Sequence, residues 1–439
     1  MTLEPDDFHF VDPMGDTEDI SRYTPGGYHP LRVGDIIKSS RIDDISGAAP
    51  QYRIMHKLGF GSYATVWLAQ KTDSSKFVAV KVTTDDAALT NEAAILEAVS
   101  KVRTTEESHV LTLLDHFTIH GPNGKHLVLV TDVVAPILKV RFPKRDPLWY
   151  KTAALGLVKG VAHLHATGIV HGDLHLGNVG VAFPQLAHED PDDVMQDLSP
   201  YDLTIVLPSS AINQTPSLPP YVVAPCNLSA YYNKLANSDL PKTKLIDFGS
   251  AHEAGKSPLH FQCAVEACAP EVVFSRVVED VDNPPMEPPT DIWALGAAIY
   301  EIVTGSSLFR GIGMTGVLPE MIVMAGTLPH AWEEWHKGLA NPPTVSPTRA
   351  DSWWRQRRET LRQNCADDAD ADALIALLRK LLVLDPTARP TAEQITQDEW
   401  FLQTGKPTKE AQISFNTQVR FGSSPSPVIS ASLVHAVKA

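Results

Sequence analysis

The sequence predicts an α+β protein in which a small sheet with one helix precedes a larger, mainly helical part. Strand-like runs with short turns come first, and from Leu148 onward apolar residues recur at helical spacing. The expected strands lie within residues 52–82, 110–117 and 127–130. The expected helices cover about 87–100, 149–167, 291–304 and 371–384.

Two glycines interrupt the first strand-like runs, in the stretch Leu58-Gly59-Phe60-Gly61-Ser62-Tyr63-Ala64-Thr65-Val66. Their backbone can lie against phosphate groups because no side chain intervenes. Taken alone, such a pair is more often a plain hairpin turn than a loop that covers a nucleotide.

A lysine follows in the apolar strand Val78-Ala79-Val80-Lys81-Val82. An unpaired charge in such a strand is costly, so Lys81 needs a partner or a ligand. Glu92, in the helical stretch 90–97, is the expected partner, with Glu97 as the alternative.

Two carboxylates and an amide then mark a phosphate-transfer site. Asp173 lies in the loop His171-Gly172-Asp173-Leu174-His175-Leu176-Gly177-Asn178, and Asp247-Phe248-Gly249 follows an apolar pair. This spacing lets Asp173 face a hydroxyl nucleophile while Asn178 and Asp247 hold magnesium on a nucleotide. Phosphotransferases that act on small molecules have a similar loop.

Together these motifs resemble the eukaryotic protein kinase family from Tyr52 to Phe401. The later stretches Ala269-Pro270-Glu271, Asp291–Gly296 and Arg389 match landmarks of protein kinases and not of small-molecule phosphotransferases. The resemblance implies a two-lobed protein kinase fold, with an N-lobe at about 52–131 and a C-lobe at about 135–401. It also implies that Glu271 pairs with Arg389 and that Asp291 anchors the catalytic loop.

By this resemblance the chain is an ATP- and Mg²⁺-dependent serine/threonine protein kinase. Lys81, held by Glu92, would grip the phosphates, Asp173 would be the catalytic base, and Asn178 and Asp247 would bind magnesium. The implied ATP-binding residues are Leu58, Gly59, Gly61, Val66, Ala79, Lys81, Thr131, Asp132 and Val134.

One subfamily is more similar than the others. Residues 26–35, Trp67 after the glycine-rich stretch and the proline-rich insert at about 183–241 resemble the SR-protein kinases (SRPK). That likeness implies protein substrates rich in arginine and serine.

Several positions depart from the kinase pattern. Gly172 replaces an arginine that binds a phosphorylated activation loop, which predicts intrinsic activity. His175 replaces a lysine that reaches the γ-phosphate, and Cys263 replaces the threonine that contacts that lysine. Ala264 and Glu266 also differ, so we expect a rebuilt substrate site in which His175 is catalytic and Cys263 and Glu266 face substrate. A nucleotide-binding pseudokinase is the first alternative and a small-molecule phosphotransferase the second.

The flanking segments have their own composition. Residues 1–25 are acidic and expected to be disordered, residues 26–51 lead into the domain, and 402–439 form a tail. The acidic run 367–372 either favours the start of a helix or docks an arginine-rich substrate.

Composition limits the remaining functions. The 439 residues, 43% hydrophobic, can bury a large core, and no apolar run approaches a membrane span. The net charge of −15 argues against direct nucleic-acid binding and suits basic peptides. The acidic start does not resemble a signal peptide, and four cysteines without a metal-ligand pattern suggest reduced thiols. We therefore expect a monomer in the cytoplasm and nucleus.

Overall fold

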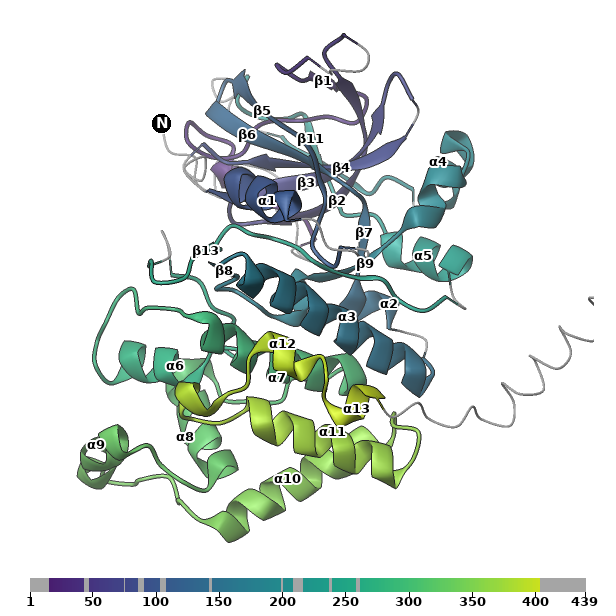
Figure 1. Ribbon diagram of the computed structural model, residues 1–439. Coiled ribbons are helices and arrows are strands. Elements are labelled where there is room, and N and C mark those ends of the chain that lie inside the picture. The colour runs from purple at the N-terminus through teal and green to yellow at the C-terminus, as the bar shows by residue number, and fades with distance from the viewer. Residues whose placement is uncertain are drawn as a thin grey trace, which may run out of the picture. The chain divides into compact units, whose positions relative to one another are not determined.

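A six-stranded antiparallel sheet, in the order β1-β2-β3-β4-β6-β5, forms the N-lobe (Figure 1). Helix α1 contacts β5 beside this sheet. The N-lobe elements are β1 (Ile36–Lys38), β2 (Gln51–Gly61), β3 (Ala64–Lys71), β4 (Phe77–Thr83), α1 (Glu92–Lys101), β5 (Leu113–Gly121) and β6 (Gly124–Thr131).

The alternation of side chains along β4 explains why this strand is apolar and still carries a lysine. Val78, Val80 and Val82 pack into a core on one face of the sheet. Ala79 and Lys81 point to the opposite face because successive side chains alternate. The lysine therefore faces the C-lobe and not the core that contains Val78, Val80 and Val82.

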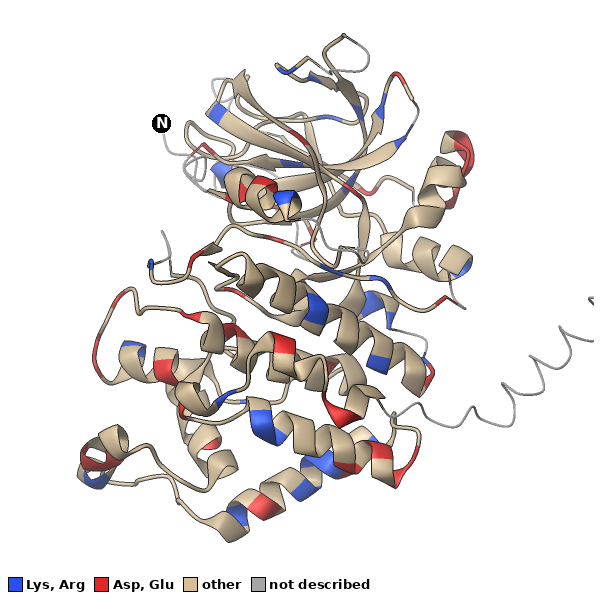
Figure 2. Cartoon of the chain, viewed as in Figure 1, with Lys and Arg blue, Asp and Glu red and all other residues tan. Residues whose placement is uncertain are grey.

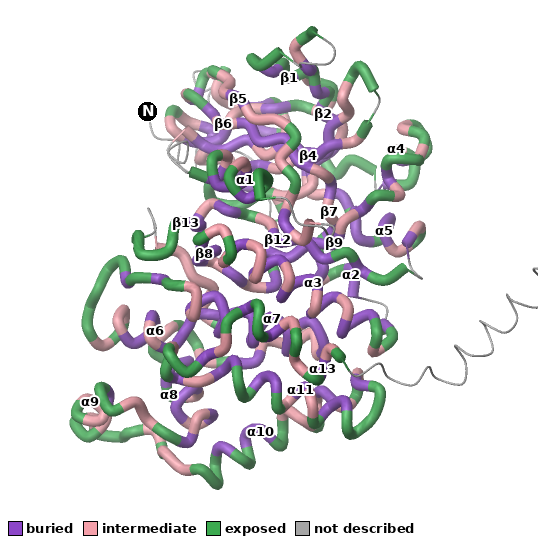
Figure 3. The backbone as a smooth tube through the Cα atoms, in the orientation of Figure 1, coloured by how far each residue is buried: buried purple, intermediate pink, exposed green. Residues whose placement is uncertain are grey.

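Two buried helices, α3 and α7, pack against each other at the centre of the C-lobe. Figure 3 shows most of their length as buried, whereas the peripheral α9 has only exposed and intermediate residues. The helices are α2 (Ile137–Val140), α3 (Pro147–Ala166), α6 (Pro270–Val277), α7 (Pro288–Thr304), α8 (Gly313–Ala325), α9 (Glu333–Gly338), α10 (Pro347–Arg362), α11 (Asp368–Leu381), α12 (Ala392–Ile395) and α13 (Glu399–Leu402).

Two small sheets lie between the N-lobe and these helices and carry the loops of the site. One has the strand order β12-β9-β7 and the other pairs β13 with β8. Their strands are β7 (Val134–Pro136), β8 (Ile169–Val170), β9 (Val179–Ala182), β12 (Thr243–Leu245) and β13 (His252–Glu253).

The predicted insert at about 183–241 contains its own elements and contacts both lobes. Val223 packs into the outer core of the N-lobe sheet, whereas Leu228 and Tyr232 pack into the main core. Its elements are α4 (Pro191–Asp197), β10 (Leu203–Ile205), β11 (Tyr221–Val223) and α5 (Leu228–Ala236), with β10 antiparallel to β11.

This computed structural model describes residues 16–42, 47–74, 76–85, 91–102, 108–141, 144–198, 200–207, 216–236, 239–257 and 261–402. The predicted tail, from residue 403 on, lies outside them, as do residues 1–15. Within the described helices, none is long and apolar enough to cross a bilayer.

The expectation of disorder over residues 1–25 is wrong for residues 16–25. Glu18 and Tyr23 are buried, and Glu18 forms an ion pair with the buried Lys57. One of the acidic residues that suggested disorder is therefore buried in the N-lobe. Its ion pair with Lys57 compensates the cost of burying the charge.

The helix bounds differ modestly from the prediction. The last predicted helix, 371–384, runs from Asp368 to Leu381. It begins earlier than predicted because Asp367 caps its first turn. The predicted start of the first helix, at 87, lies outside the described residues, and the described helix begins at Glu92. Strand β5 begins at Leu113 instead of residue 110.

Candidate active site

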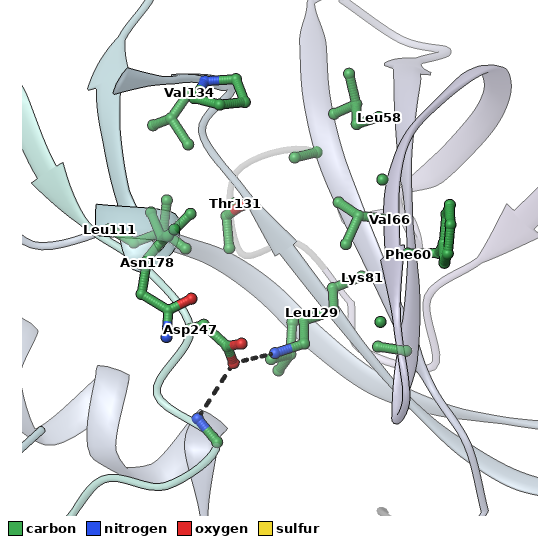
Figure 4. Close-up of a pocket in the computed structure, with 18 of the residues that line it drawn as sticks. Leu58, Phe60, Val66, Lys81, Leu111, Leu129, Thr131, Val134, Asn178 and Asp247 are labelled. Carbon is green, nitrogen blue, oxygen red and sulfur yellow. Dashed lines mark hydrogen bonds and ion pairs between the residues drawn. The ribbon is translucent and has the colours of Figure 1, made fainter. Parts of the chain in front are cut away.

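A cavity of about 510 Å³ opens between the β2–β3 hairpin, the segment joining the lobes and the loops of the C-lobe. Figure 4 shows side chains from both lobes pointing into it. All the residues assigned to ATP binding line this cavity: Leu58, Gly59, Gly61, Val66, Ala79, Lys81, Thr131, Asp132 and Val134.

Lys81 lies at the centre of a charged cluster. Its Nζ is 2.9 and 2.8 Å from the two oxygens of Glu92 and 2.9 Å from Oδ1 of Asp247 (Figure 4 shows the contact with Asp247). Glu97, the alternative partner, contacts His116 and Arg41 instead. The lysine therefore joins the N-lobe helix α1 to the Asp247 loop.

The cluster fixes the charge state of its members. Burial opposes the charge of Lys81, but Asp247 and Glu92 outweigh it and raise the pKa of the lysine. The charge of Lys81 lowers the pKa of Asp247 to about 2. Burial raises the pKa of Glu92 above its ordinary value although Lys81 opposes that shift. The cluster thus offers a cation and an ionised Asp247 at neutral pH.

The backbone around Asp247 directs its carboxylate into the cavity. Asp247 has a φ of 59°, which is rare for residues other than glycine. The next residue, Phe248, is fully buried, lies 5.2 Å from the His171 ring between centroids, and donates its N–H to Glu92 at 3.3 Å. These contacts hold the loop in the conformation that presents Asp247 to Lys81.

Asn178 and Asp173 lie together in the lining of the cavity. The Asn178 amide nitrogen donates to the backbone carbonyl of Asp173 at 2.9 Å. That bond leaves the amide oxygen of Asn178 on the side of Asp247, beside which it lies in Figure 4. An amide oxygen and a carboxylate are suitable ligands for Mg²⁺ completed by phosphate and water oxygens, so the residues fit this ion.

His175 lies at the rim near the carboxylate of Asp173. Its Nε2 is 4.0 Å from Oδ2 of Asp173, and its Nδ1 accepts a hydrogen bond from the Gly177 N–H at 3.1 Å. Burial lowers the pKa of His175, so the ring is neutral at neutral pH. It can donate a hydrogen bond through Nε2 but does not supply the fixed positive charge of a lysine.

Asp291, on α7, holds the backbone of the catalytic loop. Its carboxylate accepts from the His171 N–H at 2.8 Å and the Gly172 N–H at 3.1 Å, and lies 2.9 Å from His165 Nε2. Burial opposes ionisation, but these partners keep the pKa of Asp291 below its ordinary value. This arrangement agrees with the predicted anchoring role.

The backbone also explains the glycine at position 172. Gly172 has a φ of +77°, and a Cβ there would lie 2.9 Å from the Ser250 carbonyl oxygen and 3.2 Å from the His252 ring. An arginine at this position would require a different loop conformation.

The predicted ion pair between Glu271 and Arg389 is present. The guanidinium makes two hydrogen bonds to the carboxylate, at 2.8 and 2.6 Å, and the Arg389 side chain is fully buried. Arg389 also donates to the carbonyls of Val383 and Pro289. This pair joins α6 to the end of the C-lobe.

Cys263 and Glu266, the predicted substrate residues, do not line the cavity and lie in the segment before α6. A hydrogen bond with Cys268, together with burial, raises the pKa of the Cys263 thiol well above its ordinary value. It is therefore a neutral group. Glu266 is exposed.

The acidic run 367–372 starts helix α11, as the simpler of its two interpretations predicted. Asp367 accepts from the Asp370 N–H, and the other carboxylates already have basic partners within the chain. Figure 2 shows the acidic and basic residues of α10 and α11 side by side. The pairs are Asp368 with Arg358 and Arg362, Asp372 with Arg358, and Asp370 with Lys151. We do not retain the docking interpretation.

Sequence reasoning missed one wall of the cavity. Residues 225–229, from the insert, line it beside the segment that joins the lobes. Cys226 donates its backbone N–H to the carbonyl of Lys57, next to Leu58 of the glycine-rich hairpin, at 2.8 Å. No local motif marks this contact, because it joins segments far apart in the chain.

Comparison with known proteins identifies the family. The sequence model of the protein kinase domain matches residues 52–182 and 232–401, more than half of the chain. The chain belongs to the protein kinase family. The gap between the two matched stretches, residues 183–231, falls within the predicted insert.

Similar kinases include members of the subfamily that the sequence resembles. The serine/threonine-protein kinase SKY1 of Saccharomyces cerevisiae is 34% identical over 177 residues, 37% of this chain and 22% of that protein. The serine/threonine-protein kinase SRPK of Physarum polycephalum is 29% identical over 314 residues, 67% of this chain and 66% of that protein. The chain thus spans less than two thirds of either relative.

A solved kinase domain has the same fold. This crystal structure is 17% identical, has a TM-score of 0.52 and covers 84% of this chain and 99% of its own. The two-lobed kinase fold predicted from the sequence is confirmed.

Proposed function

We propose that this protein kinase transfers the γ-phosphate of ATP to serine or threonine hydroxyls of arginine/serine-rich proteins. The observation that carries the catalytic part is the complete Lys81–Glu92–Asp247 cluster in a cavity that also contains Asp173 and Asn178. This arrangement favours an active kinase over a pseudokinase that only binds nucleotide.

Each residue then has a defined task. Lys81 positions the phosphates, and Asp173 orients the substrate hydroxyl and accepts its proton. Asn178 and Asp247 would hold magnesium, which neutralises charge on the phosphates. His175 donates a hydrogen bond from Nε2 toward the transferred group, without a positive charge.

The proposed preference for arginine rests on the carboxylates of Glu266 and Glu301. Glu266 is exposed and close enough to influence His175 and Glu301. Burial, with the charge of Glu266, raises the pKa of Glu301. A guanidinium from a substrate would relieve this repulsion and bind carboxylate oxygens through paired hydrogen bonds. The SRPK likeness supports the same substrate class.

The test compares phosphorylation of arginine/serine-repeat and acidic peptides at low and high salt. We expect a preference for the basic peptides that weakens with salt, because exposed charges are screened. Glu266→Ala should reduce the preference several-fold, whereas the control Glu334→Ala, an exposed carboxylate on α9, should not.

Two outcomes would contradict the proposal at different levels. Equal rates on basic and acidic peptides would remove the substrate class and leave the kinase activity. Nucleotide binding without transfer to any protein or peptide would favour the pseudokinase. We further propose that the protein acts in the cytoplasm and nucleus, as its acidic, thiol-containing sequence suggests.

A further inference from the structure

The segment before the kinase domain, residues 16–33, is anchored in the N-lobe by a buried ion pair. The side chains of Glu18 and Lys57 are fully buried and contact each other, and the Tyr23 hydroxyl donates to Glu18. The Lys57 ammonium also lies 4.7 Å from the centroid of the Trp67 ring. The segment is therefore a fixed part of the N-lobe.

A second anchor places Tyr28 over the end of strand β2. The Asn123 amide, from the β5–β6 turn, donates to the Tyr28 carbonyl at 2.6 Å. The side chain of Tyr28 is buried, and the Arg22 guanidinium lies 5.0 Å from the centroid of its ring. A Cβ at Gly27 would clash with the Arg22 carbonyl oxygen at 1.8 Å, so the turn between these residues requires glycine.

From these anchors, two side chains bind consecutive carbonyls at the tip of the glycine-rich hairpin. The Tyr28 hydroxyl donates to the carbonyl of Gly61 at 2.7 Å, and the Arg22 guanidinium donates to the carbonyl of Ser62. Both donors belong to residues 16–33, before the kinase domain. Ser62 and Tyr63 line the cavity.

Because the peptide bond is planar, these two contacts also determine where the N–H groups of Ser62 and Tyr63 point. In a trans peptide the C=O and the next N–H point in opposite directions within one plane. Binding the carbonyls of Gly61 and Ser62 toward residues 16–33 therefore turns the N–H groups of Ser62 and Tyr63 away from that segment. Backbone N–H groups at such a turn are phosphate ligands.

We propose that Tyr28 and Arg22 are positioning residues of the nucleotide site, which aim the N–H groups of Ser62 and Tyr63 at the phosphates of ATP. The inference deepens the proposed function and rests on its assignment of the cavity to ATP. It makes residues 16–33 a part of the phosphate site, although they do not contact nucleotide themselves.

The test measures binding of magnesium-ATP and of adenosine to the full chain by calorimetry. Tyr28→Phe removes one hydroxyl donor and keeps the ring. We expect about five-fold weaker binding of ATP, the effect of a single neutral hydrogen bond, and unchanged binding of adenosine, which has no phosphates. Arg22→Met, which keeps the chain length but not the donor, should show the same selectivity.

A matched control comes from the insert. The Tyr201 hydroxyl donates to the Met55 carbonyl at 3.0 Å, so Tyr201→Phe removes the same kind of bond from the same strand, away from its tip. We expect this variant to bind both ligands like the wild type. Equal weakening of ATP and adenosine, no weakening in either test variant, or selective loss in Tyr201→Phe would overturn the positioning role.

The expected effect of Tyr28→Phe on ATP binding does not depend on whether the protein transfers phosphate. Wild-type protein that binds ATP but transfers no phosphate would refute the proposed kinase activity, while the selective effect of Tyr28→Phe on ATP could still be observed.

Discussion

At the scale of single residues, Asp173 has a position that separates catalysis from nucleotide binding. The Asn178 amide donates mainly to the Asp173 backbone carbonyl, at 2.9 Å, and only at 3.5 Å to its carboxylate, which also lies 4.0 Å from His175 Nε2. We expect a change of the carboxylate to an amide to keep the 2.9 Å bond from Asn178 to the backbone carbonyl and to remove the base.

Asp173→Asn should therefore lower turnover by roughly 10²–10⁴-fold, the usual contribution of a general base. The affinity for ATP should change little, because Lys81, Asn178 and Asp247 are untouched. Steady-state kinetics together with nucleotide titration would check both parts. Wild-type turnover in this variant would refute the assignment of Asp173.

At the scale of elements, two histidines join residues 16–33 to strand β6. The rings of His29 and His126 lie 4.9 Å apart between centroids, and His29 Nδ1 and His126 Nε2 have no hydrogen-bond partner among the described residues. Burial, and then the neighbouring His126, lowers the pKa of His29 to about 4, although Asp35 opposes the shift. Burial also lowers the pKa of His126.

This pair predicts acid sensitivity. An unfolded histidine takes up a proton near pH 6.5, but His29 in the folded protein does so only near pH 4. Its contribution to stability is complete above about pH 6.5 and is lost as the pH falls toward 4. Denaturant unfolding at pH 7.5 and 5.0 should show a smaller loss for His29→Phe than for wild type.

The exposed His330 supplies the control, since His330→Gln should leave the pH dependence as it is in the wild type. If wild type and His29→Phe lose the same stability between the two pH values, the histidine pair does not cause the acid sensitivity.

At the scale of the whole molecule, the described parts of the segment from Asp247 to Glu271, which corresponds to the activation segment of protein kinases, are held by contacts within the chain. The Glu271–Arg389 pair fixes its end, and the Ser250 hydroxyl is buried and donates to Gln262. Gly172 provides no guanidinium to bind a phosphate in this segment. We therefore expect the Lys81 cluster to assemble without such a phosphate.

We expect protein made in bacteria and treated with phosphatase to retain its kinase activity within about two-fold, a difference well below 1 kcal/mol. Peptide phosphorylation before and after treatment would measure this, with mass spectrometry to show that Ser250 and Ser257 are unmodified. Activity that arises only after another kinase modifies either serine would contradict the prediction.

The sequence predicted most of the cavity because its motifs are local. A glycine pair in a hairpin and a lysine in an apolar strand can each be recognised from a few neighbouring residues in the sequence. Contacts between distant segments had no such signal. The burial of Glu18 depends on Lys57, and the wall at 225–229 depends on the backbone of β2. Composition alone therefore made residues 16–25 look disordered.

The insert has a mechanical consequence for the two lobes. Between β11 and α5 the chain passes from the N-lobe core at Val223 to the main core at Leu228, so it is a second connection between the lobes besides the link at residues 132–134. Two lobes joined by a single connection can rotate relative to each other about any axis. A second connection, or tether, restricts their rotation to the axis that passes through both connections. We expect the rate of ADP release, which stopped-flow fluorescence measures, to rise in Val223→Ala, where that second tether is loosened.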